Sequence, residues 1–217
     1  MLRIAIEHTT HHSQIGGDVT RFGTLCCLCL LLGLRVSAQE HRPVTRLSAP
    51  EFVSLAGRCA PTAPADTLLA IARTESGLYA NAISINRPKA AARRAGHWDG
   101  ELVLTKQPKD RTEAKSWLRW FTLHHYTVSI GLMQVNAELA PHFQVKAEQL
   151  LEPCTNIRVG ASILISLYTD LAREMGEGFS ALDRALSFYN TGNSIAGFRN
   201  GYVANVYANA PRRSPFF

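Results

Sequence analysis

The chain has 217 residues, of which 46% are hydrophobic and 18% charged, and its formal net charge is +6. This length suits one domain, or one domain with a removable segment, and the composition excludes a disordered chain. Lysine and arginine form no stripe beyond the short runs "ARRAGH" and "PRRS". A small positive charge without such a stripe is typical of a solvated surface, so we expect no nucleic-acid partner.

The first 38 residues have the features of a secretory signal peptide. Arg21 precedes the apolar run "TLCCLCLLLGL", and "VSA", ending at Ala38, places small residues at the usual cleavage positions. The apolar run is too short for a transmembrane span. We therefore predict cleavage after Ala38 and export, with no integral membrane span in the mature protein; a membrane-retained anchor is the alternative. Cleavage removes three basic and two acidic side chains, so the charge falls from +6 to +5.

Two of the five cysteines remain after this cleavage, Cys59 and Cys154. An even pair in an exported protein suggests a disulfide. The bond would close a loop of about ninety-five residues and stabilise the fold by roughly 4–5 kcal/mol on the chain-entropy estimate. Two buried thiols are the alternative.

The periodic segments that follow an N-terminal linker over 39–54 are all helical. The first helix is expected from about Ala63, with Thr62 as its cap, and Gly77 ends it. Four residues of this helix share one face at spacings of three and four: Leu68, Ile71, Ala72 and Glu75.

Residues 86–111 are polar and broken by proline and glycine, which predicts a loop. Further helices are expected around 117–124, from near Thr155 to Gly176, from Ser180 with Asp183 in a weak capping box, and from Gly201 to Asn209. The pattern predicts one all-α domain over 55–209, followed by a short tail over 210–217.

A carboxyl group stands near the end of the first helix, on its apolar face. Glu75 loses hydration there, and this loss disfavours its charged form and raises its pKa. A carboxyl that stays protonated near neutral pH can act as a general acid, the task that begins glycoside cleavage. The alternative is a glutamate at a frayed helix end whose side chain reaches water.

The segment "SIGLMQVN" combines a glycine with two amides. Gly131 has no side chain, so a ligand or another backbone can approach it closely. Gln134 and Asn136 can donate and accept hydrogen bonds, which suits the amide and hydroxyl groups of a sugar. Met133 offers an adaptable contact for a methyl group. The alternative is a core turn with incidental amides.

The segment "SFYNTGN" places Tyr189 and Asn190 at the end of a helix, followed by Gly192. The phenol of a tyrosine in this position can reach a catalytic carboxyl. The alternative is a core aromatic residue whose hydroxyl bonds to the backbone.

Three segments, "ARTESG", "GLMQVN" and "SFYNTG", resemble in order and spacing the three motifs of the lysozyme-like soluble lytic transglycosylases, glycoside hydrolase family 23. The longer segments "CAPTAPADTLLAIARTESG" and "LEPCTNIRVGASIL" are similar to the transglycosylase subunit of bacterial type IV secretion and conjugation systems, which carries a cysteine in each context. The resemblance covers about residues 55–209. It implies an all-α, lysozyme-like single domain of the goose type.

The resemblance also implies roles for single residues. Glu75 matches the one catalytic acid, and Ser84 matches a serine that helps to polarise the N-acetyl group of the substrate. Tyr189 matches the tyrosine near the catalytic carboxyl, with Asn190 beside it. The substrate-cleft motif is matched by Gly131, Leu132, Met133 and Gln134.

The function that the resemblance implies is a periplasmic peptidoglycan lytic transglycosylase that opens the cell wall for a secretion or conjugation apparatus. Glu75 protonates the oxygen between N-acetylmuramic acid and N-acetylglucosamine. It then removes a proton from the C6 hydroxyl, which closes a 1,6-anhydro ring, so no metal and no other cofactor are expected. The implied partners are glycan strands and components of the apparatus.

Two other functions stay open. A lysozyme-type hydrolase needs a second acid that positions water, and the sequence places none of Asp110, Glu113 and Glu138 across the cleft. An inactive wall-binding scaffold has no need of an intact acid and its accompanying motifs.

Overall fold

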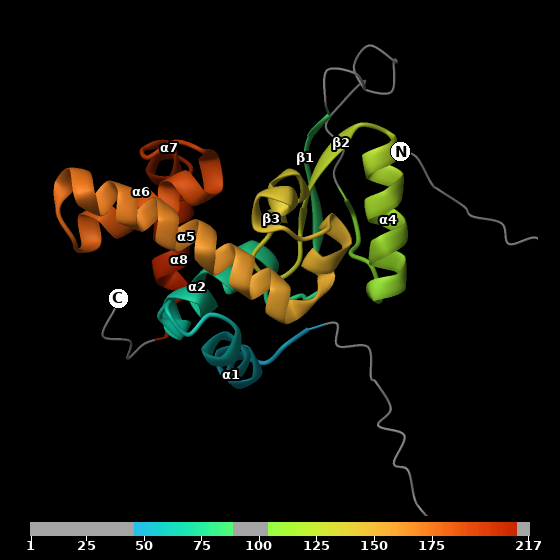
Figure 1. Cartoon of the computed structure of the whole chain (residues 1–217), viewed down its shortest axis with the longest axis horizontal. Helices are drawn as coiled ribbons and strands as arrows, with labels where there is room; N and C mark the ends of the chain where they lie inside the picture. Colours follow the sequence, from blue (N-terminus) through green and yellow to red (C-terminus); the bar gives the residue numbers. More distant parts are fainter. Residues whose placement is uncertain (1–45, 89–103, 212–217) are drawn as a thin grey trace, which may run out of the picture. The chain divides into compact units, whose positions relative to one another are not determined.

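Figure 1 shows the computed structural model of the chain, which describes residues 46–88 and 104–211. All of them belong to one unit, residues 41–217, built of helices and one small sheet. The expected signal peptide lies outside the described residues, as do residues 89–103 of the expected loop and the end of the expected tail.

Helix α1 spans Ala49–Cys59 and was not expected, since its first residues fall within the segment assigned as a linker. The hydroxyl of Ser48 accepts a hydrogen bond from the Glu51 amide, and the Glu51 carboxylate accepts one from the Ser48 amide at 2.7 Å. This capping box starts the helix, and its buried Phe52 and Ala56 then join the core.

Helix α2 spans Ala65–Ser76 and ends as predicted at Gly77, whose φ of 59° lies in the left-handed region that glycine adopts without strain. The expected cap was wrong: Pro64 occupies the N-cap position and no side chain bonds to the first turn. Thr62 belongs to the turn that follows α1, so the helix begins later. The predicted apolar face is confirmed, because Leu68, Ile71 and Ala72 are buried.

A three-stranded antiparallel sheet was also not expected. Its strands are β1 (Ile83–Pro88), β2 (Tyr126–Ile130) and β3 (Val135–Asn136), in the order β1-β2-β3. The pair Ser84 and Ser129 fixes the register of the first two strands. The strands are short, and β1 is far from the other two in sequence, so local periodicity does not reveal them; the domain remains mainly helical.

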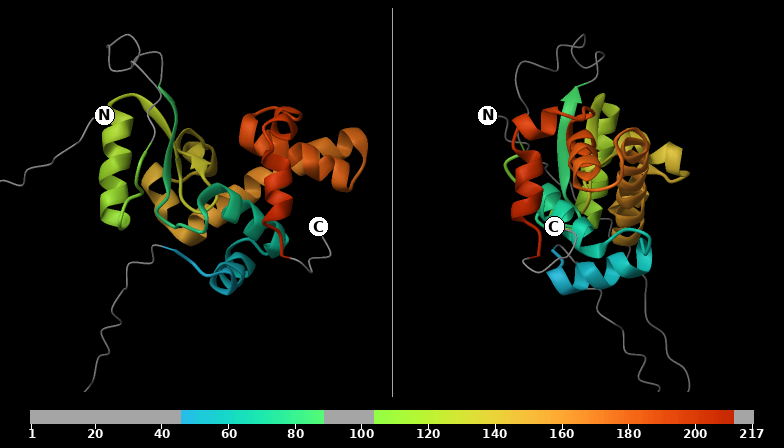
Figure 2. Two further views of the ribbon diagram at one scale, coloured as in Figure 1. Left: turned by 180° about the vertical axis from the view of Figure 1, so that it is seen from behind. Right: turned by 90° about the vertical axis from the view of Figure 1, so that its left-hand side faces the viewer.

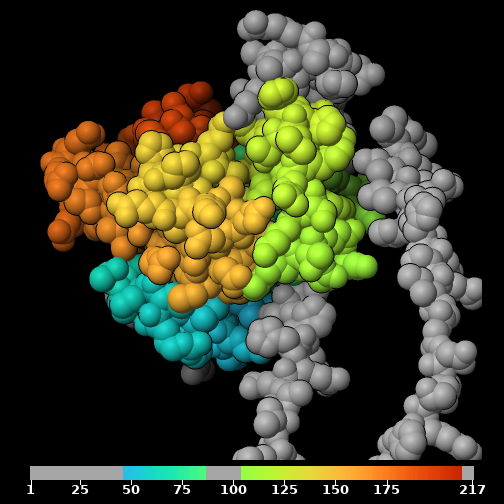
Figure 3. All heavy atoms as spheres, turned by 45° about the vertical axis from the view of Figure 1, so that its right-hand side comes forward, coloured from blue at the N-terminus to red at the C-terminus, as the bar shows by residue number. Residues whose placement is uncertain are grey.

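Helix α4 spans Arg111–Leu123 and confirms the helix expected around 117–124, with Asp110 as its N-cap. Two short 3-10 helices, η1 (Ala137–Phe143) and η2 (Ala147–Leu151), follow the sheet. In the space-filling view of Figure 3 these yellow to amber segments lie against the yellow-green α4, and α4 contacts both β2 and η2.

Three of the four remaining helices come close to their predicted positions. They are α5 (Pro153–Met175), α6 (Phe179–Thr191), α7 (Ala196–Arg199) and α8 (Tyr202–Ala208), of which α7 was not expected. Gly176 ends α5 as predicted. The weak capping box of α6 was wrong: Gly178 is the N-cap, and Asp183 instead accepts a hydrogen bond from the Tyr207 hydroxyl on α8.

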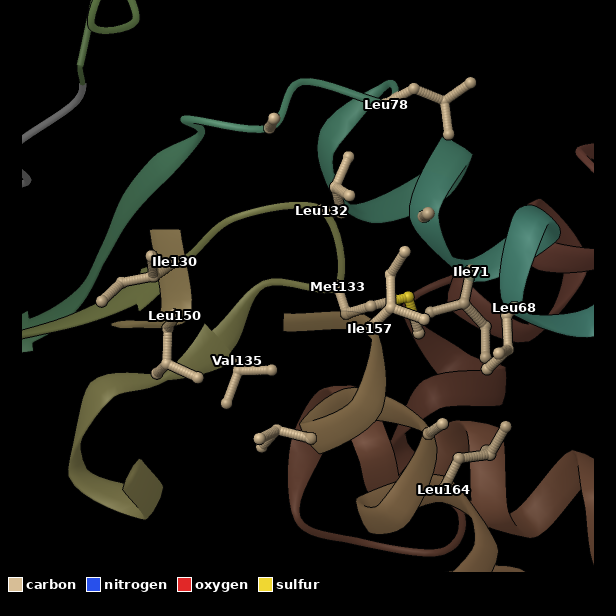
Figure 4. Packing of buried hydrophobic residues seen from close by; sticks show 14 of the residues in the cluster. Leu68, Ile71, Leu78, Ile130, Leu132, Met133, Val135, Leu150, Ile157 and Leu164 are labelled. Carbon is tan, nitrogen blue, oxygen red and sulfur yellow. The ribbon is translucent and has the colours of Figure 1, made fainter. Parts of the chain in front are cut away.

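The long helix α5 connects two groups of elements. The sheet and α4 lie toward its first half and α6 packs along it, while α8 lies beside α2 (Figures 1 and 2). In the core, Met133 lies close to Ile71 of α2 and Ile157 of α5 (Figure 4). None of the helices in the described ranges is long and apolar enough to cross a membrane.

The predicted disulfide is confirmed. Cys59, the last residue of α1, is bonded to Cys154 near the start of α5, across a sequence separation of 95 residues. The bond fixes α1 to the first turn of α5. These two helices also contact each other directly.

Candidate active site

Glu75 lies in the last turn of α2 and is mostly buried. Its Oε1 accepts a hydrogen bond of 2.6 Å from the hydroxyl of Tyr202, the first residue of α8. Burial raises the pKa of Glu75 from 4.5 to about 7, although the Tyr202 hydrogen bond acts in the opposite direction by stabilising the carboxylate. A substantial fraction of Glu75 is therefore protonated near neutral pH, as its place on an apolar helix face predicts.

Tyr202 is a residue that the sequence reading missed. It follows Gly201, whose φ of 80° allows the turn from α7 into α8. Burial and the nearby Glu75 carboxylate raise the pKa of Tyr202 far above its ordinary value, so the phenol stays a hydrogen-bond donor. Its partner lies 127 residues away in sequence, and no local motif links the two.

Tyr189, the tyrosine that was expected beside the acid, has its hydroxyl on the backbone instead. It donates a hydrogen bond of 2.8 Å to the carbonyl of Met133. Tyr189 is near enough to Glu75 that the charge of this carboxylate adds to burial in raising the pKa of the phenol. Tyr189 therefore lies close to Glu75, but its hydroxyl binds the backbone of Met133.

The loop of residues 131–134 is fixed from the inside by Asn156 of α5. The buried Asn156 amide donates hydrogen bonds of 2.8 Å to the carbonyls of Ile130 and Leu150, and its oxygen accepts one of 2.7 Å from the Met133 amide. A Cβ atom on Gly131, whose φ is 77°, would lie 2.5 Å from the Asn156 nitrogen. The missing side chain thus makes room for Asn156 and for the backbone carbonyl of Leu150, which would lie 2.9 Å from the same Cβ atom.

Leu132 and Met133 are fully buried in the core, and each has 0% of its surface accessible to solvent. They line neither of the hollows described below, so the expected contact of Met133 with a substrate methyl group was wrong. The loop turns both side chains inward because Asn156 and Tyr189 hold its backbone from the α5 side. The Leu132 carbonyl also accepts a hydrogen bond of 2.8 Å from the Ser76 hydroxyl, which ties the loop to α2.

Ser84 of β1 and Gln134 of the same loop form a pair. The Ser84 hydroxyl donates a hydrogen bond of 2.7 Å to Gln134 Oε1, and the Gln134 amide nitrogen donates one of 2.9 Å to the Gly131 carbonyl. Gln134 has a φ of 45°, a left-handed conformation that is uncommon for a residue with a side chain and recurs at functional sites. The Ser84 oxygen keeps a lone pair for a ligand.

Two adjoining hollows meet at Glu75, Ser84 and Gln134. The larger, of about 880 Å³, lies between the sheet side and the C-terminal helices. Its lining includes the predicted residues Asn136, Tyr189 and Asn190. The smaller, of about 330 Å³, extends past Gly77 and contains Arg46. Both volumes fall in the range of ligand sites, and a carboxyl at their junction faces the middle of any long ligand.

A family model for the transglycosylase SLT domain matches residues 53–209. The chain belongs to this family. The motifs that carry the resemblance in the sequence are thus part of an SLT domain, which accounts for nearly all of the described residues and includes Glu75 and Tyr202.

Curated proteins with similar sequences bear the name virB1. The chain is 33% identical to protein virB1 of Rhizobium radiobacter over 177 residues, 82% of this chain and 68% of that protein. It is 34% identical to protein virB1 of Agrobacterium fabrum over 169 residues, 78% of this chain and 63% of that protein. It is 32% identical to the type IV secretion system protein virB1 of Brucella suis over 165 residues, 73% and 63% of the two chains. No solved structure matches.

Within the SLT domain, Asn200 joins the groove wall to the tyrosine that contacts the acid. Its side-chain nitrogen donates a hydrogen bond of 2.9 Å to Asn190 Oδ1, and its oxygen accepts one of 3.0 Å from the Tyr202 amide. Asn190 and Asn200 both line the larger hollow. Asn190 was predicted because it stands in the motif "SFYNTG" on α6, whereas Asn200 lies ten residues later in the turn after α7 and was missed.

Glu75 is the one carboxylate among the described residues that line the two hollows of the SLT domain. Asp110 is used as the cap of α4, where it accepts a hydrogen bond of 2.8 Å from the Glu113 amide. Glu138 stands in the first turn of η1 and lines neither hollow. The described part of the groove therefore holds one candidate acid and no partner carboxylate for it.

Proposed function

We propose that this chain is a peptidoglycan lytic transglycosylase in which Glu75 is both the acid and the base. The observation that carries the proposal is one mostly buried carboxyl, with a pKa of about 7, at the junction of two hollows. A glycan strand that occupies both hollows places a glycosidic bond beside this carboxyl. The SLT family match supports the same reaction.

In the first step protonated Glu75 gives its proton to the oxygen that links N-acetylmuramic acid to N-acetylglucosamine. The bond from this oxygen to the anomeric carbon breaks, and N-acetylglucosamine leaves with the proton. The carbonyl oxygen of the neighbouring acetamido group bonds to the anomeric carbon and takes up the positive charge. The Tyr202 hydrogen bond stabilises the Glu75 carboxylate that results.

In the second step the Glu75 carboxylate removes the proton of the C6 hydroxyl on the same muramyl residue. The C6 oxygen then bonds to the anomeric carbon, and the acetamido oxygen leaves it. The product carries a 1,6-anhydro ring, and Glu75 is protonated again. One group with a pKa near 7 suits both steps because it is readily protonated and deprotonated at neutral pH.

Ser84 suits the role of polarising the acetamido group. Its hydroxyl donates to Gln134, so its oxygen is available as an acceptor for the acetamido N–H. Accepting this hydrogen bond shifts electron density from the N–H toward the carbonyl oxygen that attacks the anomeric carbon. Gln134 orients Ser84 in this arrangement and need not touch the substrate.

We further propose that the enzyme is exported and acts for a type IV secretion or conjugation apparatus. Relatives at 32% identity are named type IV secretion system proteins, and the virB1 relatives span most of this chain. The N-terminal features described above support export to the periplasm. Cys59 and Cys154 form a disulfide, as is usual in an oxidising compartment.

Product analysis tests the reaction. Digestion of purified peptidoglycan is expected to release muropeptides that end in 1,6-anhydro-N-acetylmuramic acid, each lighter by one water than the hydrolytic product. Glu75→Gln is expected to give none, while its binding to cell walls persists. Reducing-end products from the wild type would favour a lysozyme-type hydrolase, and wall binding without any product would favour the scaffold.

A further inference from the structure

The smaller hollow contains a guanidinium that the reaction at Glu75 does not use. Arg46 is exposed, and its Nε donates a hydrogen bond of 2.8 Å to the carbonyl of Gly77 at the end of α2. Its Nη2 would lie 3.4 Å from a Cβ atom on Gly77, so the guanidinium rests directly on this glycine. The backbone of Arg46, which precedes α1, pairs with the backbone of Tyr79 in an isolated antiparallel bridge.

The charge of Arg46 has no anionic partner in the described part of the chain. The ion pairs described there join Arg111 to Glu152 and Arg173 to Asp170. The pKa of Glu75 is governed by burial and by its hydrogen bond from Tyr202, not by an ion pair with Arg46. Since Nε alone is used, the outer nitrogens of the guanidinium can bind a further acceptor.

The smaller hollow becomes cationic when the enzyme is ready to act. Among its described lining residues, Arg46 and Glu75 are the two that can carry charge. Glu75 must be protonated to act as the acid, and this leaves Arg46 as the charge of the hollow. The other lining groups include the polar side chains of Tyr79 and Gln107, and Gln107 already bonds to the Ile83 backbone through both its oxygen and its nitrogen.

We propose that this hollow is a subsite for a carboxylate of the peptide stem, with Arg46 as the group that recognises it. The inference rests on the proposed function, which runs a glycan strand through both hollows. The sugars of that strand are neutral, whereas the stem peptides on its muramyl residues carry free carboxylates. A guanidinium beside the cleavage point binds such a carboxylate through paired N–H donors. The enzyme therefore prefers stems with free carboxylates over amidated stems.

The test compares two forms of uncrosslinked glycan strands, one with free stem carboxylates and one in which these carboxylates are converted to amides. Binding is measured in the Glu75→Gln background, so it does not depend on turnover, and kcat and KM are measured with Glu75 present. The variants are Arg46→Gln, Arg46→Lys and the matched control Arg58→Gln. Arg58 is an exposed arginine of α1 that donates to Ser54 and lines neither hollow.

We expect the parent protein to bind the carboxylate strand about fivefold more tightly than the amidated strand, the size of one exposed ion pair. Arg46→Gln should reduce this ratio to about one, through Kd and KM and without a change in kcat on the amidated strand. Arg46→Lys should keep part of the preference, and Arg58→Gln all of it.

Two results would overturn the subsite. The parent protein could bind both strands equally, or Arg46→Gln could weaken both by the same factor, as expected if Arg46 serves only to cap α2. Binding of both strands with the expected preference but without any 1,6-anhydro product would leave the subsite in place and refute the proposed reaction. Failure to bind either strand would refute both.

Discussion

Replacing Glu75 by glutamine should stabilise the protein in a pH-dependent way while removing its activity. The pKa of Glu75 is raised from 4.5 to about 7 by burial, so the folded state binds this proton more tightly than the unfolded state. The contribution of the group to stability is fully present below pH 4.5 and is lost as the pH rises through about 7. Above that pH the folded protein holds a carboxylate in a site that disfavours it.

The difference between these pKa values corresponds to about 3 kcal/mol at alkaline pH. The glutamine variant has no such loss, and its side-chain oxygen can still accept the hydrogen bond from Tyr202. We therefore expect Glu75→Gln to be more stable than the wild type by up to about 3 kcal/mol at pH 9 and by much less at pH 5. In thermal unfolding this corresponds to roughly 6–12 °C at pH 9 for a domain of this size.

The measurement is reversible unfolding of the exported form at pH 5 and pH 9, by urea and by heat. Glu174→Gln, which alters an exposed carboxyl on α5, is the control and should show no comparable pH-dependent gain. A stability difference that is the same at both pH values, or a variant less stable at pH 9, would refute the view that Glu75 is held in a site unfavourable to its charge. The gain in stability together with lost activity is typical of an active-site group.

Three further predictions concern the surroundings of Glu75. Tyr202→Phe removes the hydrogen bond that lowers the pKa of Glu75, so the alkaline limb of the kcat/KM profile, expected near pH 7 in the wild type, should move to higher pH; an unmoved limb would contradict this. Cys154→Ser should lower the free energy of unfolding by roughly 4–5 kcal/mol, and reductant should then have no further effect on stability. Asn156→Ala leaves three buried backbone groups unpaired and should cost about 3 kcal/mol or more in urea unfolding, whereas a cost under about 1 kcal/mol would show that water replaces its amide.

The features that the sequence revealed are those with a local cause. An apolar stripe that ends in Glu75 and a glycine determine the last turn of α2 without help from the rest of the chain. The burial of that stripe then raises the pKa of Glu75, as the same pattern predicts. The end of α5 at Gly176 has an equally local cause.

The features that the sequence concealed depend on distant partners. Tyr202 contacts Glu75 across 127 residues, and Asn156 bonds to Ile130 across 26. No local sequence pattern around Tyr202 or Asn156 indicates which residue it contacts. The sheet is hidden for the same reason, since β1 meets β2 more than thirty residues later and each strand is too short to show its period.

Gly131 shows what a glycine in a motif does and does not reveal. Its lack of a side chain does allow a close approach, and the sequence left open whether a ligand or another backbone makes it; the approaching groups are the Asn156 side chain and the backbone carbonyl of Leu150. A glycine pattern shows that space is needed and does not show what fills it. The motif "GLMQ" consequently supports the cleft from within, and Gln134 is the member of it that lines the groove.

Helix α8 has two opposite effects on the acid, and their balance explains a pKa near neutrality. It packs beside α2, and at its end Asn209 bonds to Thr74 and Arg73, the residues just before Glu75. This packing helps to withdraw Glu75 from water, which favours the protonated form. The same helix supplies Tyr202, whose hydroxyl favours the carboxylate. Burial raises the pKa of Glu75 and the hydrogen bond lowers it, so the two together favour a carboxyl that can donate a proton and then accept one.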